Sequence, residues 1–197
     1  MPWLEPVSLS GPHASLKPLS HDHLAGLTEA VKDGELWKLW YTFIPKAEDM
    51  RKEIDRRLGL QAAGAMLPWT VFDADGRIAG MTTYMNVDAP NRRVEIGSTW
   101  YAQRVQRSAV NTQCKLLLLG HAFEKFDCIA VEFRTHFFNH QSRRGIERLG
   151  AKLDGILRSH QIAANGTLRD TVVYSIIASE WPTVQAHLTY QLHEKAR

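Results

Sequence analysis

Cysteine is scarce in this sequence, which contains only Cys114 and Cys128. The two form no Cys-x-x-Cys pair and have no metal-ligand spacing, which excludes a cysteine-based metal site and a disulfide-stapled scaffold. We therefore interpret both as reduced core thiols of a cytoplasmic protein. The His-Glu-x-x-His motif of zinc proteases is also absent, and we expect no metal cofactor.

Long apolar runs and a strong excess of one charge are missing as well. No stretch approaches the roughly 18 apolar residues of a membrane span, and the N-terminal MPWLEPVSLS lacks the basic and apolar regions of a signal peptide. A net charge of +3, from 24 basic and 21 acidic residues, is too small to indicate nucleic-acid binding, although an anionic small ligand remains possible. We expect neither a membrane nor a nucleic-acid partner.

The 197 residues include 44% apolar residues and show no linker, repeat or low-complexity segment, so a single domain over 1–197 is expected. Two short strands are expected around Gly11-Pro12, before a helix that Ser20 caps. The aromatic stretch ELWKLWYTFIP (35–45) is expected to be helical and to precede an amphipathic helix. The apolar stripe of that amphipathic helix consists of Met50, Ile54 and Leu58.

Beyond residue 66 the apolar period changes from about 3.6 to about 2, which indicates strands. A hairpin flanks Asp75-Gly76, and a third strand follows at 92–102. A helix and another strand come next through short connections, which implies a right-handed crossover and a parallel pairing. The remaining expected elements are a helix over about 112–126, a strand at 128–137, a helix at 140–150 capped by Asn139, a hairpin of 151–161 and 170–178, and a C-terminal helix after Ser179.

A polar stretch, QRSAVN (106–111), runs directly into the predicted helix that follows the third strand. The first amides of a helix have no partner within it, and the positive end of the macrodipole lies behind them, so such a turn can bind an anion such as a pyrophosphate. Arg104 and Arg107 add positive charge, and the small Ser108 and Ala109 permit close approach to the backbone. Most helix starts bind only water, and neither a Walker loop nor a Gly-rich dinucleotide fingerprint is present.

The surrounding run, IGSTWYAQRVQRSAVNTQCKLLLLGHAFEKF, resembles the acyl-CoA-binding core of the GNAT superfamily of N-acyltransferases. The superfamily pattern Q/R-x-x-G-x-G/A falls on Gln106, Ala109 and Asn111, so both glycine-type positions are changed. The segment from Asn111 to Glu124 matches NTxxKxLLLxHAFE of the branch similar to the ribosomal-protein N-terminal acetyltransferases (RimJ/RimL-like). NHQSRRGIERLGAKLDGILRSH (139–160) and RDTVVYSIIASEWP (169–182) are similar to later segments of that branch.

The resemblance implies an α/β (α+β) GNAT fold, with a mixed, mostly antiparallel seven-stranded sheet, flanking helices, and a central parallel pair that splays apart. It implies transfer of the acetyl group of acetyl-CoA to a primary amine, either a protein N-terminal α-amine or a small-molecule amine, by direct attack in a ternary complex. The alternative is a degenerate GNAT domain that binds CoA or a partner without catalysis, which the loss of both motif glycines favours. Branch members often form homodimers, and the late hairpin and C-terminal helix offer a possible interface.

The resemblance also implies where acetyl-CoA binds. The pantetheine arm would lie along the strand from Val94 to Tyr101 and against the helix after the fifth strand of the family fold. The implied cofactor-binding residues are Thr99, Trp100, Tyr101, Gln106, Arg107, Ser108, Ala109, Val110, Asn111, Thr112, Asn139 and Ser142.

For the chemistry, the branch pattern implies that Ser142 protonates the departing thiolate while Asn139 contacts the pantetheine arm; the alternative is that Asn139 is only an N-cap and Ser142 a solvated residue. Glu95 is the candidate base, unless it is an exposed residue paired with Arg92 or Arg93, and His136 is a second candidate. The implied acceptor-binding residues are Trp37, Tyr41, Tyr84, Asn86 and His136, although aromatic runs such as 37–43 are more often part of a core.

Overall fold

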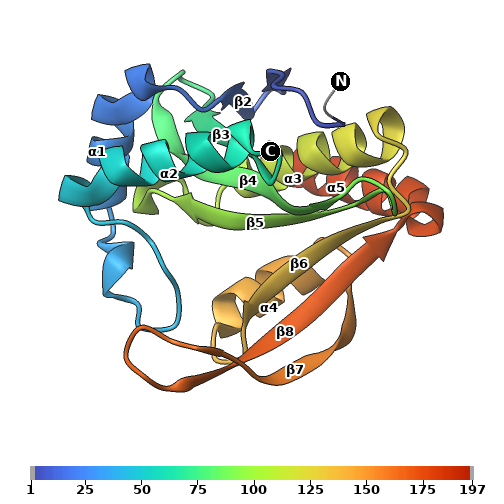
Figure 1. Ribbon diagram of the computed structural model, residues 1–197. Helices are drawn as coiled ribbons and strands as arrows, with labels where there is room; N and C mark the ends of the chain where they lie inside the picture. The colour runs from blue at the N-terminus through green and yellow to red at the C-terminus, as the bar shows by residue number, and fades with distance from the viewer. Residues whose placement is uncertain (1–2, 196–197) are drawn as a thin grey trace.

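The framework of the computed structural model, which describes residues 3–195, is one mixed sheet with helices on both faces (Figure 1). Its eight strands lie in the order β1-β2-β3-β4-β5-β6-β8-β7. All neighbours are antiparallel except β5 and β6, which are parallel. The strands are β1 Leu9–Ser10, β2 Ala14–Pro18, β3 Met66–Asp73, β4 Ile78–Asp88, β5 Arg93–Tyr101, β6 Ala130–His136, β7 Lys152–Ile162 and β8 Leu168–Ile177.

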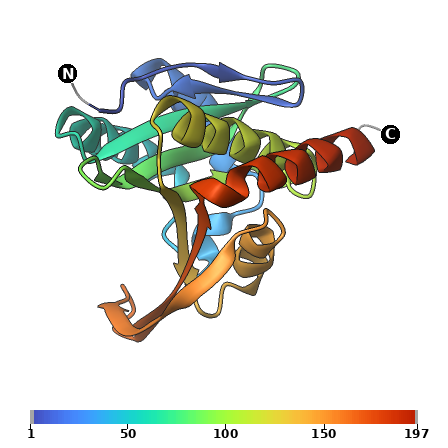
Figure 2. The ribbon, with the colours of Figure 1, turned by 90° about the vertical axis from the view of Figure 1, so that its right-hand side faces the viewer.

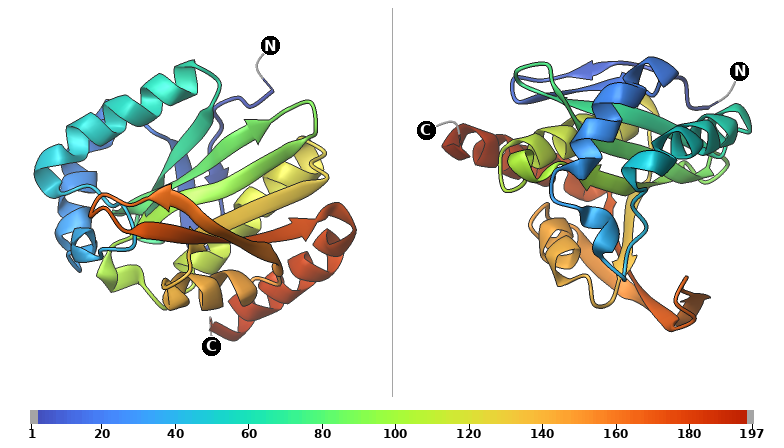
Figure 3. Two further views of the ribbon diagram at one scale, coloured as in Figure 1. Left: turned by 60° about the horizontal axis from the view of Figure 1, so that its bottom comes forward. Right: turned by 90° about the vertical axis from the view of Figure 1, so that its left-hand side faces the viewer.

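Five α-helices flank this sheet in the described chain: α1 Leu24–Lys32, α2 Met50–Ala62, α3 Val110–Gly120, α4 His140–Glu147 and α5 Trp181–Lys195. Arg57 of α2 contacts Thr83 of β4, whereas the next residue, Tyr84, contacts Leu118 of α3. Because successive side chains of a strand point to opposite faces, α2 and α3 cover opposite sides of the sheet. Figure 2 shows α3 and α5 side by side on their face, and the right panel of Figure 3 shows α1 and α2 on the other. No helix within residues 3–195 is long and apolar enough to cross a membrane.

The predicted mixed sheet with one parallel step is confirmed, and it has eight strands rather than seven because the two-residue β1 pairs with β2. The hairpin at Asp75-Gly76 is also confirmed, with Gly76 at φ +76° where a side chain would be strained. Ser20 caps as predicted, although the turn it caps is a short 3-10 helix, His21–His23, that leads into α1.

Two helical predictions need correction. The helix predicted over about 112–126 begins at Val110 and ends as α-helix at Gly120, after which a π-helical turn covers His121–Lys125. The aromatic stretch 35–45 is not a helix: only Leu36–Lys38 form a 3-10 turn, and the rest is loop. Tertiary contacts override the local helix pattern here, because Trp40 packs against His136 at the end of β6.

The buried face of α2 also differs from the predicted stripe. Met50 and Ile54 are buried, but Leu58 is only partly buried, and Glu53 and Arg57 fill the remaining positions. The two charges neutralise each other, since Arg57 Nε donates to Glu53 Oε1 over 2.7 Å. A charged pair can therefore occupy positions at which the periodicity of apolar residues predicts none.

The parallel pair is short and then opens. Its register runs Arg93↔Ala130, Val94↔Val131 and Glu95↔Glu132, and no further pair joins β5 and β6 in the described chain, although β5 continues to Tyr101 and β6 to His136. The two strands diverge from this point, as Figure 1 shows. A bulge lies just beyond: Ser98 and Thr99 of β5 stand opposite one residue of β4, and Ser98 has φ +47°.

Candidate active site

The site is built on the gap between β5 and β6. Each strand keeps its ladder with its other neighbour, β4 for β5 and β8 for β6, so the edges that face each other beyond Glu95 have no strand between them. Backbone amides and carbonyls along such an edge need other partners. An extended polar ligand can therefore hydrogen-bond to β5 in the manner of an added strand.

At the far end of β5 the chain turns into α3. A 3-10 turn, Gln103–Val105, leads to Arg107, which is exposed and has φ +60°, and α3 starts at Val110. The amides of Asn111 and Thr112 belong to the first turn of α3, where the macrodipole favours an anion. A cavity of about 260 Å³ opens beside this turn and is lined by His13, Asp73, Ala74, Asp75, Arg77, Arg104, Val105, Ser108, Ala109 and Val110.

The altered motif positions carry no backbone strain. Ala109 has φ −73° and ψ −16°, an ordinary right-handed conformation that any L-residue adopts, so a glycine is not required there. Ser108 Oγ accepts from the Val110 amide over 3.2 Å, and Gln106 Nε2 donates to the Tyr101 carbonyl over 3.1 Å. The loop is therefore held in place by its own side chains.

Arg104 does not supply the free positive charge that the sequence predicts for the loop. It forms an ion pair with Asp73 and donates to the Ile78 carbonyl over 2.8 Å. Thr112 is also engaged: its side chain is buried and accepts from Arg148 Nη2 over 3.2 Å, which leaves its amide as the group available at the helix start. Arg107 remains as the exposed cation of the loop.

The three predicted pantetheine residues divide between the two faces of β5. Thr99 faces α3, where its Oγ1 lies 2.8 Å from Thr82 Oγ1 and 3.3 Å from Lys115 Nζ. Tyr101 lies on the same side, two residues along the strand. Trp100 points the other way and is only 3% exposed, so its side chain belongs to the core and only its backbone borders the gap.

Glu95 occupies the last paired position of β5, at the point of divergence. It is 5% exposed, accepts from Asn86 Nδ2 over 2.6 Å, and lies 3.6 Å from Arg134 Nε. The alternative of an exposed residue paired with Arg92 or Arg93 is wrong, because Arg92 pairs with Asp127 and Arg93 with Glu132. Burial raises the pKa of Glu95 above the ordinary carboxyl value, against the opposing effect of Asn86 and Arg134, which makes it a better proton acceptor than an exposed glutamate.

The absence of a side chain at Gly97 leaves room for the Glu95 carboxylate. A Cβ placed on Gly97 would lie 2.9 Å from Glu95 Oε1 and 2.7 Å from Met85 Sδ, closer than real contacts allow. Close packing therefore explains why a glycine occupies this strand position, since any side chain there would displace Glu95 or Met85.

Asn139 and Ser142 lie where the chain enters α4. Asn139 Oδ1 accepts from the Ser142 amide over 3.0 Å, so the predicted N-cap role of Asn139 is confirmed. Ser142 is half-buried, and no residue within 3–195 hydrogen-bonds to its hydroxyl. The hydroxyl is thus open to a ligand, while the Asn139 side chain already has a structural task.

The predicted acceptor residues do not all come together. Tyr84 is fully buried, donates to the Leu118 carbonyl and stacks on His121, which assigns it to the core under α3. Trp37 packs against the core, and Asn86 holds Glu95. Tyr41 does approach His136, with ring centroids 6.3 Å apart.

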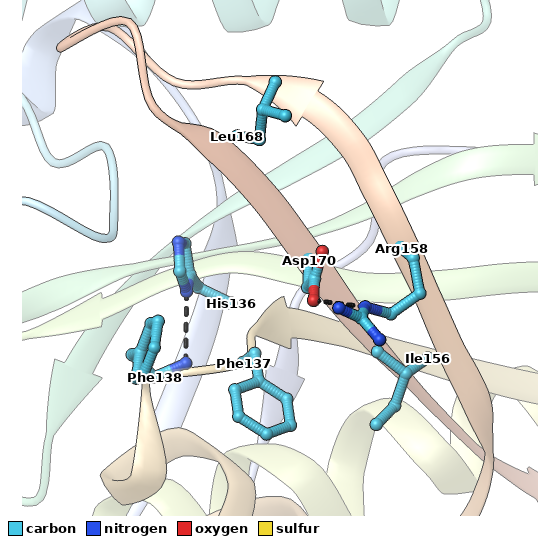
Figure 4. Close-up of a pocket in the computed structure, with 7 residues that line it drawn as sticks. All are labelled: His136, Phe137, Phe138, Ile156, Arg158, Leu168 and Asp170. Atoms are coloured by element: carbon cyan, nitrogen blue, oxygen red, sulfur yellow. Dashed lines mark hydrogen bonds and ion pairs between the residues drawn. The ribbon is translucent and has the colours of Figure 1, made fainter.

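Trp40, which the sequence pattern marks only as part of an aromatic run, lies closer to His136 than Tyr41 does, with ring centroids 5.1 Å apart. The loop that carries it descends from α1 toward the end of β6, as the right panel of Figure 3 shows. His136 Nδ1 accepts from the Phe138 amide over 3.1 Å, so the proton of the neutral ring is on Nε2. Burial and Arg169 lower the pKa of His136. His136 also borders a cavity of about 340 Å³. Its lining residues, drawn in Figure 4, are His136, Phe137, Phe138, Ile156, Arg158, Leu168 and Asp170.

Comparison with known families decides what this arrangement is. The family model described as Acetyltransferase (GNAT) domain matches residues 14–152, more than two thirds of the 197 residues. The chain belongs to the GNAT family of acetyltransferases. The strand divergence, the bulge in β5 and the polar turn into α3 all lie within the residues that the family model matches.

Relatives support the same assignment. A protein of Bacillus subtilis (strain 168) with the provisional name ribosomal N-acetyltransferase YdaF is 33% identical over 107 residues, and the match spans 54% of this chain and 57% of that relative. A GCN5-related N-acetyltransferase from Brucella melitensis has a TM-score of 0.86 at 27% identity, with 97% of this chain and 87% of that chain covered. Mycobacterium smegmatis RimJ in complex with CoA-disulfide shares the fold, with a TM-score of 0.80 at 19% identity over 94% of this chain and 95% of that one.

One buried cation of this GNAT domain gives a testable pH dependence. Lys115 is 6% exposed, and burial lowers its pKa from 10.5 to about 8. The unfolded chain therefore binds more protons than the folded one between these values, so the stability linked to Lys115 rises with pH through the folded pKa.

We expect the free energy of unfolding of the wild type, relative to Lys115→Met, to increase by about 1.4 kcal/mol from about pH 7 to about pH 9. Urea unfolding at the two pH values measures it, and the difference between the two proteins removes contributions from other groups. A pH-independent difference would show that the folded and unfolded chains bind the same number of protons over this range, so that the Lys115 amine keeps its charge and an ordinary pKa in the folded state.

Proposed function

We propose that this GNAT domain transfers the acetyl group of acetyl-CoA to a primary amine by direct attack in a ternary complex. The observation that carries the proposal is the divergence of β5 from β6, with a buried carboxyl of raised pKa at its start and the first turn of α3 at its end. The gap offers backbone partners to an extended arm, and α3 offers amides to a pyrophosphate. Acetyl-CoA has both of these parts.

The residues predicted to bind acetyl-CoA fall into two sets, one for the pyrophosphate and one for the pantetheine arm. The amides around Asn111 and Thr112, with Arg107, would hold the pyrophosphate, and Ala109 lets it approach the backbone. The edge of β5 from Thr99 to Tyr101 would hold the pantetheine arm. When bound, acetyl-CoA supplies an activated acetyl group; the polypeptide orients it and excludes water.

On the acceptor side, Glu95 accepts the proton of the attacking amine, directly or through water. Trp40 and Tyr41 form an aromatic wall over His136, at the end of β6. The acceptor is a protein N-terminal α-amine or a small-molecule amine; the provisional name of the Bacillus subtilis relative favours the former.

The test is release of free thiol from acetyl-CoA in the presence of single amines and N-terminal peptides, with mass spectrometry of the acceptor. An acceptor gain of one acetyl group with matching thiol release supports the proposal. Binding of acetyl-CoA without turnover on any acceptor supports the degenerate, binding-only alternative instead. Ala109→Trp, which fills the start of α3, is the matched control and is expected to weaken acetyl-CoA binding without loss of fold.

Ser142→Ala is expected to lower kcat roughly 10- to 1,000-fold, the usual range for one positioned proton donor, with nearly unchanged acetyl-CoA affinity. The hydroxyl would act on the departing thiolate, so its interaction is stronger in the transition state than in the ground state. Single-turnover kinetics and equilibrium binding measure the two quantities separately. Full turnover in Ser142→Ala on a good acceptor would show that the hydroxyl has no part in the reaction.

A homodimer is also proposed, through β7 and the outward face of the C-terminal hairpin. Every residue of β7 except Gly155 is exposed, including the apolar Leu153, Ile156, Leu157 and Ile162, and Leu168 of β8 is exposed as well. An exposed apolar edge strand is a ready pairing surface. Light scattering at micromolar concentration is expected to give about twice the mass of 22.4 kDa, and a monomer mass would contradict the dimer.

A further inference from the structure

Arg169, on β8, is a half-buried arginine without an acidic partner. Its one hydrogen bond within residues 3–195 runs from Nε to Thr171 Oγ1 over 3.2 Å, and no carboxylate of that range lies within ion-pair distance. Its neighbours are paired: Arg134 with Glu132 over 2.9 Å and Arg158 with Asp170 over 2.6 Å. A guanidinium offers five donors in a fixed plane, and most of those of Arg169 have no protein acceptor.

The sheet register places this guanidinium on the same face as the candidate base. Arg169 bonds to Thr171, two residues along β8, and Thr171 stands opposite His136 of β6. Side chains two apart share a face, so His136, Arg134 and Glu132 lie on that face too. Glu132 stands beside Glu95 in the parallel pair, which brings Glu95 onto it as well. The positive charge of Arg169 opposes the rise that burial causes in the pKa of Glu95.

On β5, β6 and β8 the charges of this face do not balance. These strands contribute the acids Glu95 and Glu132 and the arginines Arg93, Arg134 and Arg169, while Asp154 of β7 accepts a hydrogen bond from Ser175. Glu132 forms ion pairs with both Arg93 and Arg134. Burial raises the pKa of Glu95. Burial also lowers the pKa of Arg169, a sign that its charge is incompletely solvated. A partly desolvated guanidinium gains most from a planar anion that it can hold in a bidentate manner.

We propose that Arg169 binds a carboxylate of the acceptor, so that this GNAT domain selects amines that carry an acidic group close to the amine. The inference rests on the proposed function and deepens it. Two sources provide this chemistry: the α-carboxylate of a free amino acid, and an acidic side chain near the N-terminus of a peptide. Glu95 and Arg169 then act on the two ends of one acceptor, the amine and the carboxylate.

The experiment compares each acidic acceptor with its neutral isostere. One arm uses peptides with Asp or Asn, and Glu or Gln, at the second position; the other uses free amino acids and their amides. We expect the wild type to favour the acid by roughly 10- to 100-fold in kcat/KM, the range of a charge-assisted hydrogen bond. The arm in which the preference appears identifies the source.

Variants assign that preference to one side chain. Arg169→Gln is expected to bring the ratio of acid to isostere close to one, Arg169→Lys to restore part of it, and Arg169→Glu to reverse it toward Lys-containing peptides. Arg51→Gln, which removes an exposed arginine of α2 that has no acidic partner within residues 3–195, is expected to leave the ratio unchanged. Because the ratio is taken within one protein, partial loss of folded enzyme does not affect it.

An equal ratio in the wild type and Arg169→Gln, or no preference in the wild type, overturns the inference. If no acceptor is acetylated, the proposed function fails. A binding measurement then tests the role of Arg169 separately. Acidic and neutral peptides are titrated against tryptophan fluorescence in the presence of CoA, since Trp40 lies against His136 on this face. Tighter binding of the acidic peptide that Arg169→Gln removes supports the inference, and equal binding contradicts it.

Discussion

Glu95→Gln is expected to lower kcat roughly 10²- to 10⁴-fold, the usual contribution of a positioned general base. The amide keeps the shape of the carboxyl and can still contact Asn86, but it cannot accept the proton of the attacking amine. Because burial raises the pKa of Glu95, the wild-type rate should rise with pH through that elevated pKa. In the variant this rising limb should shift or disappear, as pH profiles of kcat/KM on a fixed acceptor would measure.

Glu132→Gln is the matched control for the proposed base role of Glu95. It removes an acid from the same face, but Arg93 and Arg134 hold the pKa of Glu132 below its usual value, despite burial, so that carboxylate is a poor proton acceptor. We expect Glu132→Gln to keep the rising limb. An unchanged pH profile in Glu95→Gln would remove the base role and leave His136, the second candidate, to be tested by the same profile.

Local sequence signals were enough to predict much of the framework. The Asp75-Gly76 turn, the Asn139 cap and the strand, helix and strand order each depend on residues near one another in the chain, and all three are confirmed. The family resemblance added the splay of the parallel pair. It came from the run 96–126, where the altered glycine positions proved compatible with an ordinary backbone conformation at Ala109.

Long-range contacts account for what the sequence could not predict. Tyr84 looks like a strand aromatic open to a groove, but its partner is the Leu118 carbonyl, 34 residues away. Trp40 meets His136 only because the loop between α1 and α2 descends to the end of β6. Arg169 is one arginine among many until the register places it on the same face of the sheet as Glu95. A sequence pattern contains no signal for such pairings.

The paired charges of α2 link the fold to the site. Arg57 is 3% exposed, and besides Glu53 it donates to Thr83 Oγ1 over 2.7 Å and to the Ser98 carbonyl over 3.1 Å. Ser98 is the positive-φ residue of the β5 bulge. The guanidinium thus ties α2 to the part of β5 that lies just past the divergence from β6.

Glu53→Ala is therefore expected to destabilise the domain by about 3–5 kcal/mol, the cost of leaving one member of a buried ion pair without its partner. Burial alone would raise the pKa of Glu53. The hydrogen bonds and charges of Arg56 and Arg57 lower it by more than burial raises it, so the pKa lies below the ordinary value. This stabilisation is present above the pKa of the unfolded glutamate and is lost as the pH falls through the folded pKa. Urea unfolding at neutral and acid pH measures both effects.

Asp55→Ala, on an exposed position of the same helix, is the control for α2 and is expected to cost at most about 1 kcal/mol because its pair with His21 is at the surface. The double variant Glu53→Met with Arg57→Met tests the cause, since replacing both charges by apolar groups should recover much of the lost stability. If the double variant is as stable as the wild type but transfers acetyl groups more slowly, Arg57 is needed to hold the Ser98 carbonyl, and with it the bulge of β5. Equal losses in Glu53→Ala and Asp55→Ala would mean that the buried pair contributes no more than a surface contact.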